Sequence, residues 1–344
     1  MKILYVFPFC NNSSVGISKL RALKELGHGV ETFDNRRPRL FNPNFIFNRV
    51  LNRFPKISHY SGIDYYVRTD TYLINRELIE AVKSKKPDLL LVDKGINILM
   101  ETIRRINEIG IVTANWFPDN LDHLNWMKRA ARTYKYFFHF DPYVVSLLKK
   151  DGFDNVYYLP FGCDPELHKI IEVSQEDFER YKCDVCFVGD YSPEREEVLS
   201  ELRDFDLSIW GYKRWKKSKL KAHYKGLISN DIEMTKLYNS CKIALNIHYK
   251  YTGEGANVRT YEISGCGAFQ LVDNKKDIAK LFKIDEEIVT YETRKELREK
   301  VVYYLLENNK RKEIGRKSQK KTYENHTLMK RMTRLLDIIQ EDCQ

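Results

Sequence analysis

The segment TGEGANVRTYEISGCGAFQLV (residues 252–272) combines a polar stretch, two glycines and an apolar run. The polar stretch predicts a short helix, which Gly265 and Gly267 would end, and the apolar run predicts a buried strand. Glu254 and Glu262 lie eight residues apart in the polar stretch. We therefore expect two carboxylates at the two ends of one short helix, directly before a strand.

Strands and helices alternate on both sides of this segment, which predicts an α/β fold with parallel sheets. The predicted strands are 2–9, 29–34, 87–95, 111–119, 135–141, 183–190, 207–211, 242–248, 268–272 and 287–291, and the segment 155–168 closes the first half. The predicted helices are 17–28, 76–86, 100–110, 142–152, 193–204, 231–241, 275–282, 294–309, 310–326 and 327–342. Residues 36–72 lack clear periodicity and are interpreted as an insertion or a loop region.

A chain of 344 residues is too long for one ordinary core, so we expect two doubly wound domains. The predicted division is 1–165 for the first domain and 166–325 for the second, with helix 326–344 packing back on the first domain. In such a pair the ligand crevice lies at the carboxyl ends of both sheets, where the two domains face a central cleft.

Composition excludes several classes of protein. Hydrophobic residues make up 43% of the chain and aromatic residues 13%, as in folded globular proteins. The apolar run at the N-terminus is too short for a secretory signal, and no run approaches the roughly 18 residues of a membrane span. The seven cysteines are odd in number and lie mostly in strand-like settings, so we expect buried thiols in a cytoplasmic protein.

The net charge of +10 is uneven. Residues 1–165 hold 24 Lys and Arg against 17 Asp and Glu, whereas the remainder holds 34 against 31. An anionic partner is therefore expected for the first half: a nucleotide, an anionic polymer, a membrane surface or a nucleic acid.

The second half resembles the CgeB-type, or spore-maturation-protein-like, branch of the group-1 glycosyltransferases, which have the GT-B fold. The resemblance rests on VCFVGDYSPER (185–195), KLYNSCKIALNIHY (236–249), GANVRTYEISGCGAFQLVD (255–273), KELREKVVYYLLEN (295–308) and YENHTLMKRM (323–332). It implies transfer of a sugar from a UDP-, GDP- or dTDP-sugar to an acceptor hydroxyl, with retention and without a metal ion or other cofactor.

The resemblance also implies roles for the 252–272 segment. Glu254 and Glu262 match the E-x7-E spacing of retaining GT-B enzymes, in which the first acid contacts the donor sugar and the second the ribose. Carboxylates accept strong hydrogen bonds from such hydroxyls. The backbone at Gly255, Ala256 and Asn257 would offer N–H groups of a helix N-terminus to the diphosphate, and Arg259 could balance its charge.

Four further residues are expected around the donor. Gly189 would leave room for the pyrophosphate at the tip of strand 183–190, and Arg195 would reach the phosphates unless it is a solvated helix charge. Asn246 and His248 end a strand that points into the same crevice, with His248 equally well explained as a satisfied polar residue.

In the first domain, Asp119 is the candidate for the group that handles the acceptor proton or the donor sugar, the alternative being a loop-capping Asp. The polar loop with Asn12, Ser13, Ser14 and Gly16 is the expected wall of the cleft on this side. Asp204 and Asp206 imitate a D-x-D metal motif, but they lie on the wrong connection and are interpreted as a turn. No metal site is predicted.

Other functions stay open at this point. The run YKRWKKSKLKAHYKG (212–226) holds seven Lys and Arg among aromatic residues, which is typical either of a solvated loop or of a surface that binds nucleic acid. The alternatives are therefore a transferase acting on nucleic acid or another anionic polymer, a sugar-nucleotide epimerase of the same fold, and a non-catalytic polymer-binding protein. The acceptor, whether polysaccharide, protein or nucleic acid, and the oligomeric state are not determined by the sequence.

Overall fold

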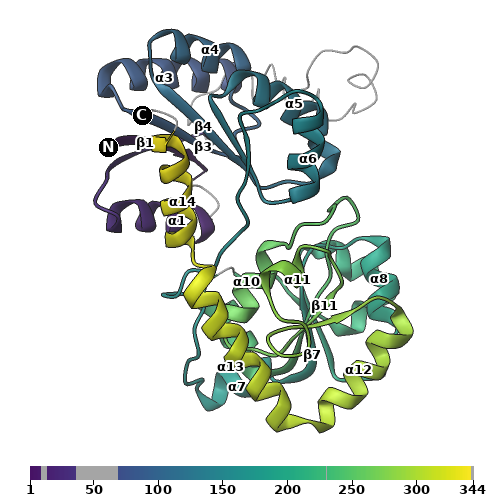
Figure 1. Ribbon diagram of the computed structural model, residues 1–344. Helices are drawn as coiled ribbons and strands as arrows, with labels where there is room; N and C mark the ends of the chain where they lie inside the picture. The colour runs from purple at the N-terminus through teal and green to yellow at the C-terminus, as the bar shows by residue number, and fades with distance from the viewer. Residues whose placement is uncertain (9–13, 36–68, 230, 342–344) are drawn as a thin grey trace. The chain divides into compact units, whose positions relative to one another are not determined.

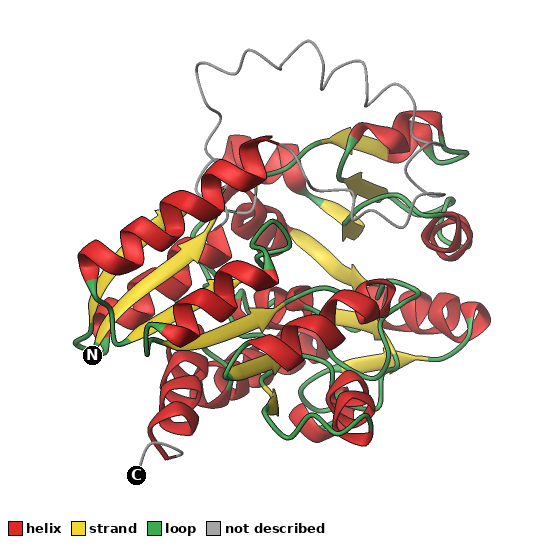
Figure 2. Cartoon of the chain, turned by 90° about the horizontal axis from the view of Figure 1, so that it is seen from above, coloured by secondary structure: helices red, strands yellow, loops and turns green. Residues whose placement is uncertain are grey.

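The computed structural model describes residues 1–8, 14–35, 69–229 and 231–341, which form two compact units. The first unit comprises residues 1–139 and 147–157, and the second comprises 140–146 and 158–344. In both units the strands lie between helices (Figures 1 and 2). No helix among the described residues is long and apolar enough to cross a membrane.

The first unit contains a sheet with strand order β2-β1-β3-β4-β5-β6. Its strands are β1 (Lys2–Phe7), β2 (Gly29–Asp34), β3 (Leu89–Asp93), β4 (Val112–Phe117), β5 (Tyr136–His139) and β6 (Val156–Tyr158). The helices between them are α1 (Ser14–Glu25), α3 (Thr69–Lys85), α4 (Met100–Glu108) and α5 (Leu124–Thr133), with a 3-10 turn η2 (Leu121–His123). Helix α6 (Pro142–Lys150) is divided, because residues 142–146 belong to the second unit. The order reverses between β1 and β3, so the unit is doubly wound.

The second unit contains a sheet with strand order β12-β11-β10-β7-β8-β9. Its strands are β7 (Cys183–Val188), β8 (Leu207–Trp210), β9 (Tyr224–Gly226), β10 (Cys241–Asn246), β11 (Gln270–Asp273) and β12 (Val289–Tyr291). Its helices are α7 (Gln175–Tyr181), α8 (Pro193–Ser200), α9 (Ile232–Ser240), α10 (Val258–Gly265), α11 (Ile278–Leu281), α12 (Arg294–Leu306), α13 (Asn308–Asn325) and α14 (Leu328–Glu341), with 3-10 turns η3 (Lys213–Lys217) and η4 (Lys221–His223).

The two faces of the second sheet have separate cores. One core joins β7, β8 and β10 to α8 and α12 through residues such as Phe187, Leu199 and Val301. The other joins the same sheet to α7, α9 and α10 through Tyr181, Leu237 and Ile263. The chain therefore changes face between β7 and β10, and parallel sheets bind ligands at such a switch point.

The prediction of two α/β sheets is confirmed, but several elements were missed. Helix α5 repeats apolar residues at helical spacing (Leu124, Met127, Ala130 and Ala131), a signal that the sequence does contain. Strand β9 has three residues and ends at Gly226 with a φ of +126°, so only its pairing with β8 identifies it as a strand. The 36–68 part of the expected insertion lies outside the described residues. Of the cysteines, 163, 183, 186 and 266 are buried and 241 is half-buried, all as free thiols, while 10 and 343 lie outside the described residues.

His326 closes the junction between α13 and α14 inside the second unit. Its Nε2 contacts the carbonyl oxygen of Leu281 at 3.1 Å, and its Nδ1 accepts from Arg331 at 2.7 Å. The ring also packs against Tyr261 and Phe282. Burial, followed by the charge of Arg331, lowers the pKa of His326 to about 4.

The second unit should therefore lose stability in acid. The unfolded chain binds a proton at His326 near the ordinary pKa of 6.5, whereas the folded chain resists it down to about 4, so stability falls as the pH falls through this window. From about pH 7 to about pH 5 the loss should be about 2 kcal/mol, measured by urea unfolding. His326→Gln should reduce this loss, whereas His223→Gln should not. An unchanged pH dependence in His326→Gln would contradict the assignment.

Candidate functional site

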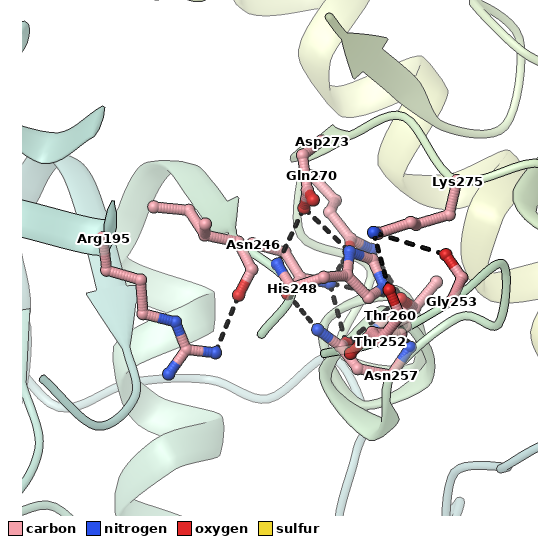
Figure 3. A network of polar contacts seen from close by, with 11 residues as sticks. Arg195, Asn246, His248, Thr252, Gly253, Asn257, Thr260, Gln270, Asp273 and Lys275 are labelled. Atoms are coloured by element: carbon pink, nitrogen blue, oxygen red, sulfur yellow. Dashed lines mark hydrogen bonds and ion pairs between the residues drawn. The ribbon is translucent and has the colours of Figure 1, made fainter. Parts of the chain in front are cut away.

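Arg195 lies at the switch point of the second unit. Ser192 caps α8 by accepting from the Arg195 N–H, and Pro193 begins the helix. The guanidinium donates to the carbonyl oxygen of Asp190, in the loop after β7, at 3.0 Å and to that of Ile247, after β10, at 2.8 Å. Figure 3 shows it beside the polar network of β10. Arg195 thus links the two loops that diverge at the switch point.

The charge of Arg195 has no carboxylate partner among the described residues: its two acceptors are backbone carbonyls, and its buried Nε has no hydrogen bond. Burial lowers the pKa of this guanidinium, with the charges of Asp190 and Asp273 opposing the effect. The alternative of a solvated helix charge is therefore wrong. A partly buried cation bound to neutral oxygens is suited to receive an anion.

Gly189, at the tip of β7, is closely packed. A Cβ at this position would lie 2.8 Å from the Phe187 ring and 3.4 Å from the Arg195 guanidinium. A Cβ on the neighbouring Gly211 would lie 2.2 Å from the Gly189 carbonyl oxygen. Glycine is thus required here by the protein's own packing, in addition to any requirement of a ligand.

A buried amide network joins β10, α10 and β11 around Asn246 (Figure 3). The Asn246 Nδ2 donates to oxygens of Asn257, Thr260 and Gln270 at 2.9 to 3.1 Å, and its Oδ1 accepts from Asn257 at 2.8 Å. Asn257 also caps α10 by accepting from the Thr260 N–H. The side chain of Asn246 is therefore occupied within the protein, and it positions the start of α10 rather than offering a free group to the donor.

His248 is occupied in the same way. Its Nδ1 contacts the Asp273 carboxylate at 2.7 Å, and its Nε2 accepts from the backbone N–H of Asn257 at 3.0 Å. Burial raises the pKa of Asp273, but the contacts with His248 outweigh it and the net shift is downward. These bonds select the interpretation of His248 as a satisfied polar residue, and they correct the expectation that the Asn257 N–H is available to a diphosphate.

The two glutamates do not lie at the two ends of the helix. Glu254 precedes α10 in a loop, where its carboxylate pairs with Lys276 at 2.7 Å. Glu262 lies inside α10 with no exposed surface, and its Oε2 pairs with Arg259. Its Oε1 has no hydrogen-bond partner and lies 3.9 Å from the Nε2 of His168, which also lacks one. Arg259 is therefore engaged with Glu262.

Asp141, which the sequence interpretation missed, fixes the loop that carries Glu254. Its carboxylate accepts from the N–H groups of Gly253 at 2.7 Å and Glu254 at 3.1 Å. A Cβ at Gly255 would lie 2.7 Å from the Asp141 Cα, so this glycine allows the close approach. Behind it, Ala256 is buried. An Asp directly before Pro142 at a helix start was the available signal.

Lys275, two residues after the end of β11, supports the same loop. Its Nζ donates to the carbonyl oxygens of Thr252 at 3.1 Å and Gly253 at 3.4 Å (Figure 3). The backbone of residues 252–254 is therefore held through both its N–H and its C=O groups. A loop bonded in this way presents its side chains in one orientation.

In the first unit, Asp119 follows β4 and pairs with Lys94 at 2.6 Å. His123 lies 3.6 Å from the same carboxylate oxygen. Lys94 has a φ of +62° and is followed by Gly95 at +69°, a tight turn that directs this lysine to the carboxyl edge of the sheet. Lys94 was missed because it is far from Asp119 in sequence, and His123 was missed because it lies in a 3-10 turn.

The expected polar wall of the first unit is described only in part. Asn12 and Ser13 lie outside the described residues, and Ser14 begins α1. Gly16 lies in the first turn of α1, where a Cβ would be 2.5 Å from the Phe7 ring. Its role is thus to pack α1 against β1.

Asp204 and Asp206 lie in the turn between α8 and β8, as predicted. Asp204 forms hydrogen bonds with Arg298 at 2.5 and 2.7 Å, and these bonds lower its pKa to about 2. Among the residues that the structure describes, no group of three His, Cys, Asp or Glu is arranged to hold a metal ion.

Comparison with known proteins agrees with this geometry. Residues 178–337 match the family described as "Glycosyl transferase-like". The chain is also 20% identical over 266 residues to the spore protein CgeB of Bacillus subtilis (strain 168). The aligned region covers 72% of this chain and 81% of that protein.

Two solved structures share the fold across nearly the whole chain. Sucrose-phosphate synthase from Thermosynechococcus elongatus has a TM-score of 0.69 at 10% identity and covers 98% of each chain. Anabaena Alr3699/HepE, solved with UDP and glucose, has a TM-score of 0.68 at 11% identity and covers 99% of this chain and 100% of its own. The family match and the GT-B fold together indicate a glycosyltransferase.

The amide network should determine the stability of the second unit. Asn246→Leu keeps the size of the side chain but leaves buried groups of Asn257, Thr260 and Gln270 without partners, so we expect a loss of roughly 3 kcal/mol in urea unfolding. Asn274→Leu, at an exposed position, should change stability by less than about 0.5 kcal/mol. Equal stabilities of the two variants would contradict the importance of the network.

Proposed function

We propose that this protein transfers a sugar from a nucleotide-sugar donor, bound by the second unit, to an acceptor hydroxyl. The observation that carries the proposal is Arg195, a partly buried cation with only carbonyl partners at the switch point of a doubly wound sheet. A donor diphosphate supplies the anion that this position lacks. The Anabaena relative in fold, solved with UDP and glucose, supports this class of ligand.

The two glutamates have separate proposed roles. Oε1 of Glu262 has no hydrogen-bond partner, so it is the atom proposed to accept from a ribose hydroxyl. Because the carboxylate is buried, the contact requires His168 or Arg259 to move. Glu254 is partly exposed in the loop fixed by Asp141 and is proposed to contact the transferred sugar.

The first unit is proposed to supply Asp119, whose carboxylate would take the proton of the acceptor hydroxyl. Retention of configuration and transfer without a divalent ion are further parts of the proposal. A cation at the departing diphosphate can replace a metal ion in stabilising its charge, and Arg195 is placed to do so.

The nearest rival is a sugar-nucleotide epimerase of the same fold, which would also bind a donor at Arg195. It needs acid and base groups on both faces of the sugar, and the geometry of the second unit supplies one partly exposed carboxylate in the donor loop, Glu254. A non-catalytic polymer-binding protein would not use a buried cation at a switch point. The transferase is therefore favoured.

A panel of nucleotide sugars tests the proposal through protection against thermal unfolding, followed by assays of transfer. A donor at 100 times its dissociation constant should stabilise the protein by about 2.7 kcal/mol. Turnover should persist in EDTA, and it should fall in Glu254→Gln and Asp119→Asn while nucleoside diphosphate affinity is kept. Protection by no member of the panel would reject the function. Epimerised donor in place of transferred sugar would select the rival.

Arg195→Gln should weaken the binding of a nucleoside diphosphate by roughly 1.5–3 kcal/mol, the range for hydrogen bonds to charged groups. The corresponding nucleoside, which lacks phosphates, should bind both forms equally in calorimetry. Arg203→Gln is the matched control, because it removes an exposed cation a short distance along the chain. Unchanged diphosphate affinity in Arg195→Gln would place the phosphates elsewhere.

A further inference from the structure

The second unit has a strongly basic surface segment that the proposed chemistry does not use. Residues 212–226, here called the basic loop, connect β8 to β9 and contain η3 and η4. No Asp or Glu occurs between residues 207 and 230. All seven cations of the loop are exposed: Lys213, Arg214, Lys216, Lys217, Lys219, Lys221 and Lys225.

The basic loop is anchored to the core of the unit. Trp215 is fully buried, and its Nε1 donates to the carbonyl oxygen of Gly189 at 2.9 Å. Leu220 is also buried, and its N–H donates to Ser218 at 3.1 Å. Both apolar side chains belong to the core formed with α8 and α12. The buried residues alternate with the cations, so the fold holds a row of positive charges at its surface.

These positive charges are not neutralised by neighbours. None of the seven cations takes part in a salt bridge within the described part of the chain. The nearest acid contact is that of Glu196, which accepts from the backbone N–H of Lys219 at 2.5 Å and from the Tyr191 hydroxyl at 3.2 Å. Arg214 lies over the Tyr191 ring, with 5.6 Å between the guanidinium carbon and the ring centre.

Two apolar side chains are exposed where the loop leaves and rejoins the sheet. Tyr212 is 62% exposed and Leu227 is 65% exposed. The N–H of Gly211 donates to the carbonyl oxygen of Gly226 at 2.9 Å, so the residues that follow these glycines emerge from neighbouring strands. An aromatic and an aliphatic side chain therefore lie close together beside the cations.

We infer that the basic loop binds the surface of an anionic lipid bilayer, an inference that does not depend on the proposed transferase activity. Cations attract anionic headgroups, and exposed Tyr and Leu side chains enter the interfacial region. Nucleic acid fits less well, because stacking on successive bases requires several exposed aromatic rings, whereas Tyr212 is exposed and Tyr224 is only half-exposed. Trp215, the largest ring of the loop, is buried and hydrogen-bonded, which corrects the expectation of an interleaved aromatic surface.

Sedimentation with phosphatidylcholine vesicles, with and without phosphatidylglycerol, tests the inference on the full chain. The protein should bind only the anionic vesicles, and binding should weaken as salt rises. Each cation near an anionic membrane contributes roughly fivefold to the binding constant, so Lys216→Gln, Lys217→Gln and Lys221→Gln together should lower it roughly 100-fold. The double variant Tyr212→Ser, Leu227→Ser should also weaken binding at high salt, where the attraction between the cations and the headgroups is already screened.

Two controls distinguish an effect of the basic loop from an effect of net charge and from non-specific hydrophobic adsorption. Lys295→Gln, Lys312→Gln and Lys320→Gln remove three exposed cations from α12 and α13 and should leave binding nearly unchanged. Leu306→Ser changes an apolar side chain that is 81% exposed and should also have little effect. The inference is overturned if the two triple variants bind alike or if the wild type ignores anionic vesicles. It is also overturned if RNA or a sulfated polysaccharide binds the protein more tightly than anionic vesicles do, and the double variant Tyr212→Ser, Leu227→Ser leaves that binding unchanged.

Discussion

The second unit depends on the saturated amide of Asn246. This side chain is buried at the carboxyl end of β10, where an unpaired amide would be strongly destabilising. Its bonds to Asn257, Thr260 and Gln270 fix the start of α10 against β10 and β11. His248 adds a second connection, since it links Asp273 on β11 to the backbone of Asn257. These bonds position the start of α10, and Asp141 and Lys275 hold the loop 252–254 that precedes it.

Other buried polar groups of the second unit, in contrast, lack hydrogen-bond or charge partners. Every side-chain nitrogen and oxygen of Asn246 and His248 is hydrogen-bonded, whereas within the described part of the chain Arg195 has no carboxylate partner and one oxygen of Glu262 has no donor. Unpaired buried polar atoms are costly, and the proposed donor would supply partners for these two. The donor assignment therefore rests on Arg195 and Glu262 more than on the strand-end residues.

Two kinds of positive charge occur in the second unit, and the fold separates them. Arg195 is partly buried and bound to two carbonyls, which suits one small anion in a defined orientation. The cations of the basic loop are exposed and flexible at their tips, which suits an extended anionic surface. Trp215 connects the two regions, because it anchors the loop through the carbonyl of Gly189, the residue beneath Arg195.

The sequence by itself determined the two α/β sheets, the helix ending at Gly265 and the identity of most candidate residues, because periodicity and glycine placement are local properties. It could not determine which polar side chains satisfy one another. Asn246 and Asn257 are eleven residues apart, and Asp141 and Gly253 are 112 apart, so their pairing exists only after the chain has folded. Asp141 was missed for this reason, and the two interpretations of His248, as a ligand contact or as a satisfied polar residue, stayed open. Tertiary structure decided the site because burial and hydrogen-bond partners, unlike helical spacing, are set by residues distant in the chain.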